Sequence, residues 1–506
     1  MQTKKLIHLT AICAVFFLVL LLCFINSING RIDFSKDKVF TLSDYSKNLL
    51  SNVSEKVQIT YYVSDKLSSL YPEARDVKDF LIEYTSKSKL VSVSIQDPQK
   101  TGLEQKLLSL GIEAQQIQTS TATETSFVSV YSAIVLEYRG KIEMIPFVVS
   151  TAGLEFELTS MLQFLIDNIT RKVQILVGND FTLDNDYIYL VPWLESAGFL
   201  CTQVFQTELA KLDYSIPLLV LGSKNLKADD IFEIENFIMQ GGNAAFCVSK
   251  NNVNIYTDWT AQPDTNTLLT DLLDYWGISI QNQLVLDIIN YRIEMQSDKQ
   301  DSRNEYINYP FWIVTGRHSL NFENILSFGY SGLETYWANP IELFEDSNLN
   351  KITPILKTST KASLMSEPFD TDPFRNKTRI FEDKAQYILA ATLQGKVKGY
   401  YTTAESPNVK IFVLADQYAP SRMIEYTNSP HNMDFFVSVL LWLSNEDNLL
   451  QIKNKGIRST SLESISNIEG VFSALKMTIF LCFILPLFIL IITYCCFVFY
   501  RKRIKK

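Results

Sequence analysis

The chain has 506 residues, of which 47% are hydrophobic and 20% charged, and its formal net charge is −9. This length is enough for roughly two or three globular domains, and the composition is not that of a disordered chain. The acidic balance, without any basic stripe, argues against a protein that binds nucleic acid.

Two long apolar runs lie near the ends of the chain. The first covers residues 6–26, preceded by Lys4 and Lys5, and the second covers residues 472–500. About 20 helical residues cross the ~30 Å core of a bilayer, so both runs predict membrane helices. The basic tail, residues 501–506, predicts that both termini are cytoplasmic and that the main domain is periplasmic or otherwise extracytoplasmic, at the bacterial inner membrane. A cleaved signal peptide is the alternative for the first run.

Residues 31–150 predict a small α/β domain. Ser43 is expected to cap a first helix. Strands are expected at 57–64 and 90–98, helices at 73–88 and 103–112, and two further strands within 127–148, around Arg139-Gly140. The order β-α-β-α-β-β is thioredoxin-like in outline, although the cysteine pair of that fold is missing.

Residues 151–455 predict a larger domain. A helix at 154–167 leads into short apolar strands that alternate with helices: KVQILV, FLCTQVFQ, PLLVLG and NAAFCV supply four of the strands. This alternation predicts a parallel sheet with helices on both faces. Segments 293–308 and 366–379 are expected to be surface loops.

Only two cysteines, Cys201 and Cys247, lie outside the apolar ends, and both stand in apolar runs. Buried free thiols are the simpler interpretation, and a disulfide is the alternative. The sequence contains no Cys/His cluster, so no metal site is expected.

Motifs spread over most of the chain resemble one family. RIDFSKDKVFTLSDYSKNLL after the first run, LEFELTSMLQFL, the stretch LVLGSKNLKADDIFEIENFIMQGGNAAFCV, LLDYWGISIQNQLVLD, KIFVLADQ and NMDFFVSVLLWLSNEDNLLQIKNK follow each other in the order of that family. They are similar to the GldG-type auxiliary subunits of bacterial ABC transporters, which include gliding-motility proteins. The resemblance implies a class I glutamine amidotransferase-like fold for residues 151–455.

An amidotransferase needs a cysteine nucleophile at a strand-to-helix turn, with a histidine nearby. Here that turn reads Gly222-Ser223-Lys224, and only His318 and His431 lie outside the apolar ends. Gly241-Gly242 follows a helix, so it is expected to end that helix rather than to bind phosphate. There is no Walker A sequence, so ATP hydrolysis is assigned to a separate subunit.

The carboxyl ends of parallel strands meet at one edge of a sheet, which would bring Gly178, Asp180, Ser223 and Asp416 together in a ligand or partner pocket. We expect no catalytic residues and no cofactor. The predicted function is that of a non-catalytic auxiliary subunit of an ABC transporter, whose extracytoplasmic domain binds substrate or an envelope partner. Its expected partners are a permease, an ATPase and the lipid bilayer, and a homo-oligomer within the complex is left open. An envelope hydrolase using Ser223 and a structural scaffold are the alternatives.

Overall fold

The computed structural model describes residues 41–457 except for 121–124, 169, 297–303, 317–318, 322–323, 328–329, 331, 345–348, 377–378, 380 and 382–383, and in addition residues 476 and 494. The chain divides into two units, residues 1–458 and 459–506. All helices and strands named below belong to the first unit.

The structure corrects the fold class expected from the sequence, which was a two-span membrane protein. No helix in the described part of the chain is long and apolar enough to cross a membrane. The longest helices there, α7 (Leu154–Asp167) and α13 (Pro430–Leu443), have 14 residues each, or about 21 Å of helix against a bilayer core of ~30 Å. The ranges 6–26, 472–500 and 501–506 lie outside the described residues, apart from residues 476 and 494.

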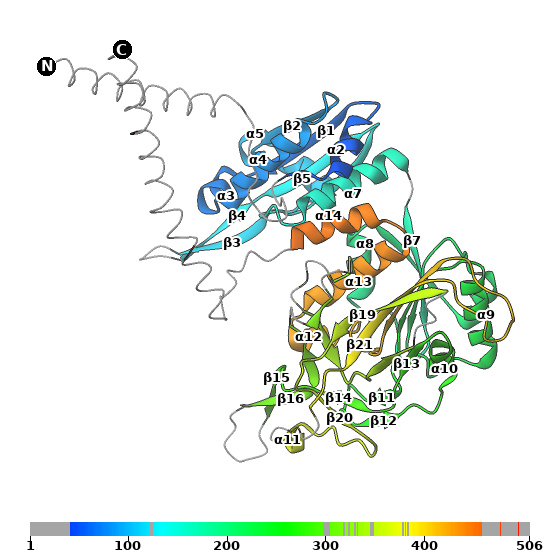
Figure 1. Ribbon diagram of the computed structural model, residues 1–506. Coiled ribbons are helices and arrows are strands. Elements are labelled where there is room, and N and C mark those ends of the chain that lie inside the picture. The colour runs from blue at the N-terminus through cyan, green and yellow to red at the C-terminus, as the bar shows by residue number, and fades with distance from the viewer. Residues whose placement is uncertain are drawn as a thin grey trace, which may run out of the picture. The chain divides into compact units, whose positions relative to one another are not determined.

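The N-terminal part contains a four-stranded sheet with the order β2-β1-β5-β6 (Figure 1). β1 is parallel to β2 and antiparallel to β5, which is antiparallel to β6. Its strands are β1 (Val57–Val63), β2 (Val91–Gln96), β5 (Ser132–Tyr138) and β6 (Lys141–Ile145). Arg139 and Gly140, with φ values of 52° and 75°, form the two-residue turn between β5 and β6 that the sequence predicted, because a tight hairpin turn requires positive φ at both central residues.

Helices cover both faces of this sheet. Helices α2, α4 and α7 share one core with the sheet, through Leu50, Leu81 and Leu158 among others. On the other face, Leu107 of α6 packs with Tyr62 and Val135. The helices and the additional hairpin of this part are α2 (Asp44–Ser51), α3 (Asp65–Leu70), α4 (Glu73–Thr85), α5 (Pro98–Thr101), α6 (Glu104–Ser109), β3 (Gln115–Ser120) and β4 (Thr125–Val130).

A buried polar cluster holds α2, α7 and the C-terminal helix α14 (Asp447–Ile457) together. Ser43 caps α2 as predicted, because its Oγ accepts a hydrogen bond of 3.1 Å from the backbone N–H of Ser46. Glu155 of α7 accepts hydrogen bonds from the Ser43 backbone N–H at 2.7 Å and from the Ser46 hydroxyl at 2.8 Å. Lys455 lies 2.8 Å from the other oxygen of Glu155 and also donates to the carbonyl of Thr41.

The second sheet has nine strands and is mixed, which corrects the prediction of a parallel sheet. The order β8-β7-β9-β10-β22 is parallel throughout. Beyond β22 the neighbours are antiparallel: β21 pairs with β22, and β18, β19 and β13 extend that half. The strands are β7 (Arg171–Val177), β8 (Phe199–Val204), β9 (Leu218–Leu221), β10 (Ala244–Cys247), β13 (Ile278–Ile280), β18 (Ile341–Leu343), β19 (Asn350–Lys357), β21 (Ile388–Gly395) and β22 (Val409–Leu414). Buried strands of either polarity consist of short apolar runs, so the direction of β21 was not visible in the sequence.

Helices lie on both faces of this sheet (Figure 1), and two clusters of buried apolar side chains join them to it. One is formed with α8, α13 and α14, and the other with the 3₁₀ helix η1 and with α9 and α10. Helix α9 ends as predicted, with Gly241 at φ 97°. The bounds are α8 (Leu190–Ser196), η1 (Gln206–Lys211), α9 (Ala228–Met239) and α10 (Leu268–Tyr275).

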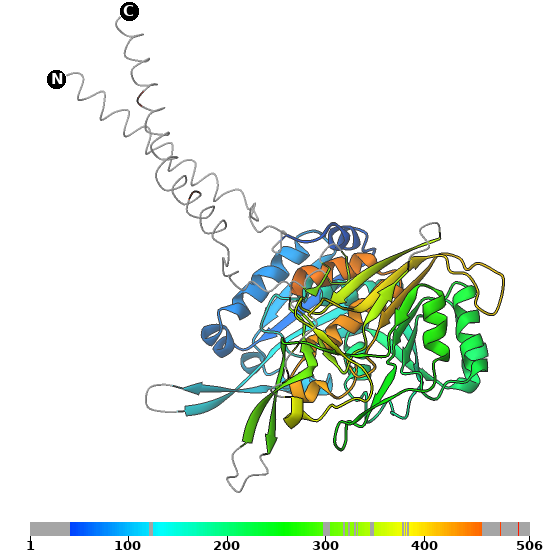
Figure 2. The ribbon, with the colours of Figure 1, turned by 60° about the horizontal axis from the view of Figure 1, so that its bottom comes forward.

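Residues 293–296 and 304–308 belong to two paired strands, not to the surface loop that the polar composition suggested, and residues 297–303 lie outside the described residues. β15 and β16 pair antiparallel, and β16 also pairs with β17. Ile307, Tyr309 and Phe311 alternate along β16 and are buried, so a period-two pattern was present among polar residues. Figure 2 shows this hairpin and the β3–β4 hairpin extending away from the sheets. The remaining elements are β11 (Asn251–Val253), β12 (Ala261–Pro263), β14 (Leu284–Leu286), β15 (Asn290–Gln296), β16 (Asn304–Val314), β17 (Glu334–Tyr336), β20 (Ser363–Met365), α11 (Pro373–Asn376) and α12 (Ile424–Thr427).

Cys201 and Cys247 are free thiols, the first half-buried and the second buried. They lie on β8 and β10, which β7 and β9 separate in the sheet. Three strand spacings amount to about 14 Å, too far for a disulfide. Burial raises the pKa of both thiols, that of Cys201 to about 12, so neither is a reactive thiolate at neutral pH.

Candidate functional site

The parallel half of the large sheet presents a crevice at the carboxyl ends of its strands. The loops after β7 and β22 reach it with Asn179–Asp186 and with Gln417 and Tyr418, and Lys224 follows β9. The chain passes from β8 on one side of β7 to β9 on the other, and such a reversal of strand order is where open α/β sheets commonly bind ligands. The crevice has a volume of ≈ 670 Å³, within the ~300–1,000 Å³ typical of ligand pockets.

Asp180, one of the residues expected in the pocket, lines the crevice. Its carboxylate accepts hydrogen bonds from Lys224 Nζ at 2.6 Å and from Asn225 Nδ2 at 2.9 Å. These hydrogen bonds, that of Lys224 first, lower the pKa of Asp180. The side chain is therefore ionised and held in place at neutral pH.

Gly178 has a packing role below the crevice. A Cβ atom at this position would lie 2.5 Å from the carbonyl oxygen of Gly222, and one at Gly222, whose φ is 73°, would lie 2.5 Å from the side chain of Asn179. The two loops touch backbone to backbone, and Asn225 donates a 2.7 Å hydrogen bond to the Gly178 carbonyl. Glycine is required at both positions because the loops approach so closely.

Ser223 is buried, and its Oγ has no hydrogen-bond partner among the described residues. His431 lies at the start of α13, where its Nε2 is 2.7 Å from Glu334 Oε2, and this hydrogen bond raises the pKa of the imidazole. No hydrogen bond in the described part of the chain joins Ser223 to His431, and His318 lies outside the described residues. Within the described residues, Ser223 is therefore not paired with the histidine base that a hydrolase would need.

Asp416 lies fully buried beneath the loop that follows β22. Its carboxylate accepts hydrogen bonds from the backbone N–H groups of Tyr336 and Tyr418, each at 2.7 Å, and of Ala419 at 3.1 Å. Burial raises the pKa of Asp416 to about 7, against the opposing effect of these donors. Asp416 thus fixes the loop that carries Gln417 into the crevice and does not itself line it.

Several lining residues were missed from the sequence. Asp186 accepts hydrogen bonds from the Thr182 backbone N–H at 2.7 Å and from the Tyr256 hydroxyl. Gln417 accepts a 2.8 Å hydrogen bond from Asn179 and donates at 3.1 Å to the carbonyl of Asn251. Tyr256 belongs to the loop between β11 and β12, and no local pattern showed that this loop folds back over the crevice.

The crevice is polar and rich in amides. Asparagine and glutamine side chains both donate and accept hydrogen bonds, which suits a neutral polar ligand with many polar atoms. The lining amides are Asn179, Asn185, Asn252, Asn254, Gln262 and Gln417. Within the described ranges no group of three or more His, Cys, Asp or Glu residues is placed to hold a metal ion.

Comparisons with known proteins agree with an assignment to transport. Residues 170–439, which include all the strands of the parallel half and the crevice, match a family described as "ABC-type uncharacterized transport system". Residues 36–137 match a family described as a domain of unknown function. An uncharacterized protein of Borreliella burgdorferi is 26% identical over 508 residues, covering 97% of each chain. Because the first of these families covers more than half of the chain, this protein belongs to the family of ABC-type transport system proteins.

Proposed function

We propose that this protein is a non-catalytic accessory subunit of a bacterial ABC transporter and that its crevice binds a polar solute. ATP hydrolysis comes from a separate subunit, and a permease is the second partner. Family membership supports the transport role in general. The assignment of the specific subunit and of the bound solute is our own.

The observation that carries the proposal is that hydrogen bonds hold the polar side chains of the crevice in place. Asp180, Asp186 and Gln417 are each held by neighbouring side chains or backbone groups. Such a preorganised polar surface suits binding, because little order has to be imposed when a ligand arrives. Among the described residues, the Ser223 hydroxyl is not hydrogen-bonded to a base, which favours a binding role over the alternative of a Ser223 hydrolase.

We keep the finer assignments as parts of this proposal. The strand order β2-β1-β5-β6 and its polarities support a thioredoxin-like fold for the N-terminal part. The parallel order β8-β7-β9-β10-β22 supports an amidotransferase-like core. Membership in the gliding-motility group and an extracytoplasmic position of the main domain rest on the sequence alone.

The first test concerns the complex. The tagged full chain, extracted in a mild detergent, is expected to bring down a permease and an ATPase subunit. Recovery of the chain alone, from an extract in which a reference ABC transporter stays assembled, would contradict the accessory role and favour the scaffold.

The second test concerns the crevice. Gln417→Ala should weaken solute-dependent transport and leave co-purification intact, because it removes hydrogen bonds to Asn179 and Asn251 without touching the helices. Lys172→Ala is the matched control, since this exposed residue lies near the amino end of β7, away from the crevice. Ser223→Ala should behave like the wild type, and loss of function in this variant would instead support the hydrolase.

A further inference from the structure

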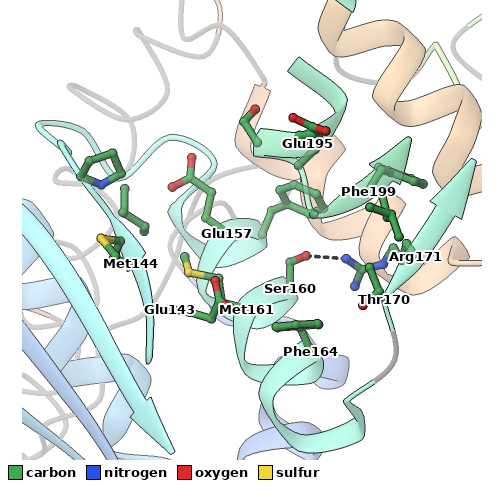
Figure 3. A pocket seen from close by; sticks show the side chains of 17 residues that line it. Glu143, Met144, Glu157, Ser160, Met161, Phe164, Thr170, Arg171, Glu195 and Phe199 are labelled. Atoms are coloured by element: carbon green, nitrogen blue, oxygen red, sulfur yellow. Dashed lines mark hydrogen bonds between the residues drawn. The ribbon is translucent and has the colours of Figure 1, made fainter. Parts of the chain in front are cut away.

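A second cavity, separate from the crevice, lies beside helix α7 (Figure 3). Its walls come from β6, from one side of α7, from the start of β7 and from the segment that joins α8 to β8. Its volume is ≈ 520 Å³, again in the range of ~300–1,000 Å³ found for small-molecule sites. None of the residues expected in a pocket from the sequence lines it.

Most of its wall is apolar. Met144 of β6 and Met161 of α7 line the cavity together with Phe164 and Phe199 (Figure 3). Phe156 also belongs to its wall. Aromatic rings supply large apolar contact areas, and unbranched methionine side chains adapt to the shape of a bound molecule. These walls suit a ligand with an apolar body.

Three carboxylates, those of Glu143, Glu157 and Glu195, also line the cavity. None of the three carboxylates has a hydrogen-bond or ion-pair partner within the part of the chain that the structure describes. Glu155, two positions before Glu157 on the same helix, accepts three such contacts. On α7, Glu155 is therefore paired, whereas Glu157, which lines the cavity, has no counter-charge within the described residues.

The surroundings of these carboxylates disfavour an uncompensated negative charge. Glu157 is exposed and Glu143 is half-buried, but the protein around them still excludes enough water to raise the pKa of both side chains. Asp434 on α13 adds to the effect at Glu157. A bound cation would lower this cost, because an opposite charge within reach favours the ionised carboxylate.

Arg171 is the one basic side chain in the described wall of the cavity, and its charge is already engaged. Its guanidinium donates hydrogen bonds to Ser160 at 2.9 Å (Figure 3) and to Gln163 at 3.2 Å. Its Nε lies 3.7 Å from Glu446, and the side chain is only 9% exposed. The charge that remains available to a ligand is therefore negative.

We propose that this cavity binds an organic cation, a small molecule that carries an ammonium or guanidinium group on an apolar body. The cationic group lies against Glu157 and Glu143, and the body lies against the methionine and phenylalanine side chains. This site is independent of the crevice, so it stands whether or not the crevice binds a solute.

The test uses three probes that share one body and differ in charge: 4-phenylbutylamine, 4-phenylbutanol and 4-phenylbutyrate. Each is titrated calorimetrically into the purified full chain at neutral pH and low salt. The amine is expected to bind at least about tenfold more tightly than the alcohol, the size of effect produced by a charged hydrogen bond in a partly buried site. The butyrate is expected not to bind measurably.

Glu157→Gln keeps the shape of the side chain and removes its charge, so it should reduce amine affinity about tenfold and leave alcohol affinity unchanged. Glu137→Gln is the matched control, because this exposed glutamate lies on the neighbouring strand β5 and does not line the cavity. The double variant Glu143→Gln/Glu157→Gln should bind amine and alcohol alike. The proposal is overturned if the alcohol or the butyrate binds as well as the amine, if no probe binds, or if Glu137→Gln weakens the amine as much as Glu157→Gln.

Discussion

The acidic side chains of the crevice and those of the cavity beside α7 differ in the hydrogen bonds that they accept. In the crevice at the edge of the large sheet, Asp180 is bonded to Lys224 and Asn225, and Asp186 to Thr182 and Tyr256. In the cavity beside α7, Glu143, Glu157 and Glu195 have no partner within the described residues.

The difference separates carboxylates that several donors hold in place from carboxylates whose oxygens accept no hydrogen bond within the described residues. A buried carboxylate that accepts several hydrogen bonds is expensive to remove, because its donors are left without an acceptor. Removal of an unpaired carboxylate leaves no donor without an acceptor, so it should cost little stability. The stability cost of substitution should therefore fall from the floor of the crevice to the wall of the cavity.

The largest effect is expected at Asp416, below the crevice. Asp416→Ala would leave the backbone N–H groups of Tyr336, Tyr418 and Ala419 buried without an acceptor. At about 1–3 kcal/mol for each of the three donors, the free energy of unfolding should fall by about 3–9 kcal/mol in urea denaturation. Asp416→Asn keeps one acceptor oxygen and should lose clearly less. Equal losses in the two variants would contradict this account of the contacts.

Asp416 also predicts a dependence of stability on pH. Its pKa is raised from 3.8 to about 7 by burial, so the folded chain holds this proton more tightly than the unfolded chain. The stability that results is present at low pH and is lost as the pH rises from about 4 to about 7. Relative to the wild type, Asp416→Asn should therefore lose less stability across this interval. A wild-type protein that gains stability there relative to Asp416→Asn would show that the three N–H donors outweigh burial.

A smaller effect is expected at the rim. Asp186→Ala removes the acceptor of the Thr182 backbone N–H and of the Tyr256 hydroxyl, and it should cost about 2 kcal/mol in the same denaturation experiment. Tyr256→Phe removes a single hydroxyl and serves as the control, with a cost of about 1 kcal/mol or less. If the two variants are equally destabilised, the carboxylate is not the organising group.

Next comes the ion pair at the mouth of the crevice. The side chains of Lys224 and Asp180 are 42% and 62% exposed, so Lys224→Ala should change the free energy of unfolding by about 1 kcal/mol or less. Added salt should reduce the difference, because exposed charges are screened. A large loss that persists in high salt would mean that Lys224 has a packing role instead.

The smallest effect is expected in the cavity, where it should have the opposite sign. The raised pKa of Glu157 means that its contribution to stability is favourable at low pH and is lost as the pH rises through the raised value. Without a bound cation, Glu157→Gln should therefore be a few tenths of a kcal/mol more stable than the wild type at pH 7.5 and no more stable at pH 4. Destabilisation at pH 7.5 would reveal a partner for this carboxylate.

The sequence predicted those parts of the fold that depend on local chemistry. The cap at Ser43, the end of α9 at Gly241 and the turn at Arg139-Gly140 were all predicted correctly, because each depends on neighbouring residues only. The direction of β21 was not visible in its apolar run, whereas the hairpin of β15 and β16 joins neighbouring segments whose period-two pattern was overlooked among polar residues.

The candidate site shows the same division. Asp180 lies in the loop that follows the parallel strand β7, and it lines the crevice. Gly178, Ser223 and Asp416 also follow parallel strands. Gly178 packs closely against Gly222, whereas Ser223 and Asp416 are buried, and Asp416 accepts a hydrogen bond from Tyr336. These contacts form only in the folded chain, so the sequence did not show them. The cavity beside α7 was invisible in the sequence, because its wall combines three separate segments that only the fold brings together.

The cluster of Glu155 and Lys455 has a mechanical consequence. Lys455, close to the last described residue of the first unit, donates to the carbonyl of Thr41, the first described residue, and pairs with Glu155. The polypeptide thus enters and leaves the described body at one place. A force that pulled residues 41 and 455 apart would act first on the polar contacts of Lys455 with Thr41 and Glu155. These contacts would break before the two sheets and their apolar cores unfold.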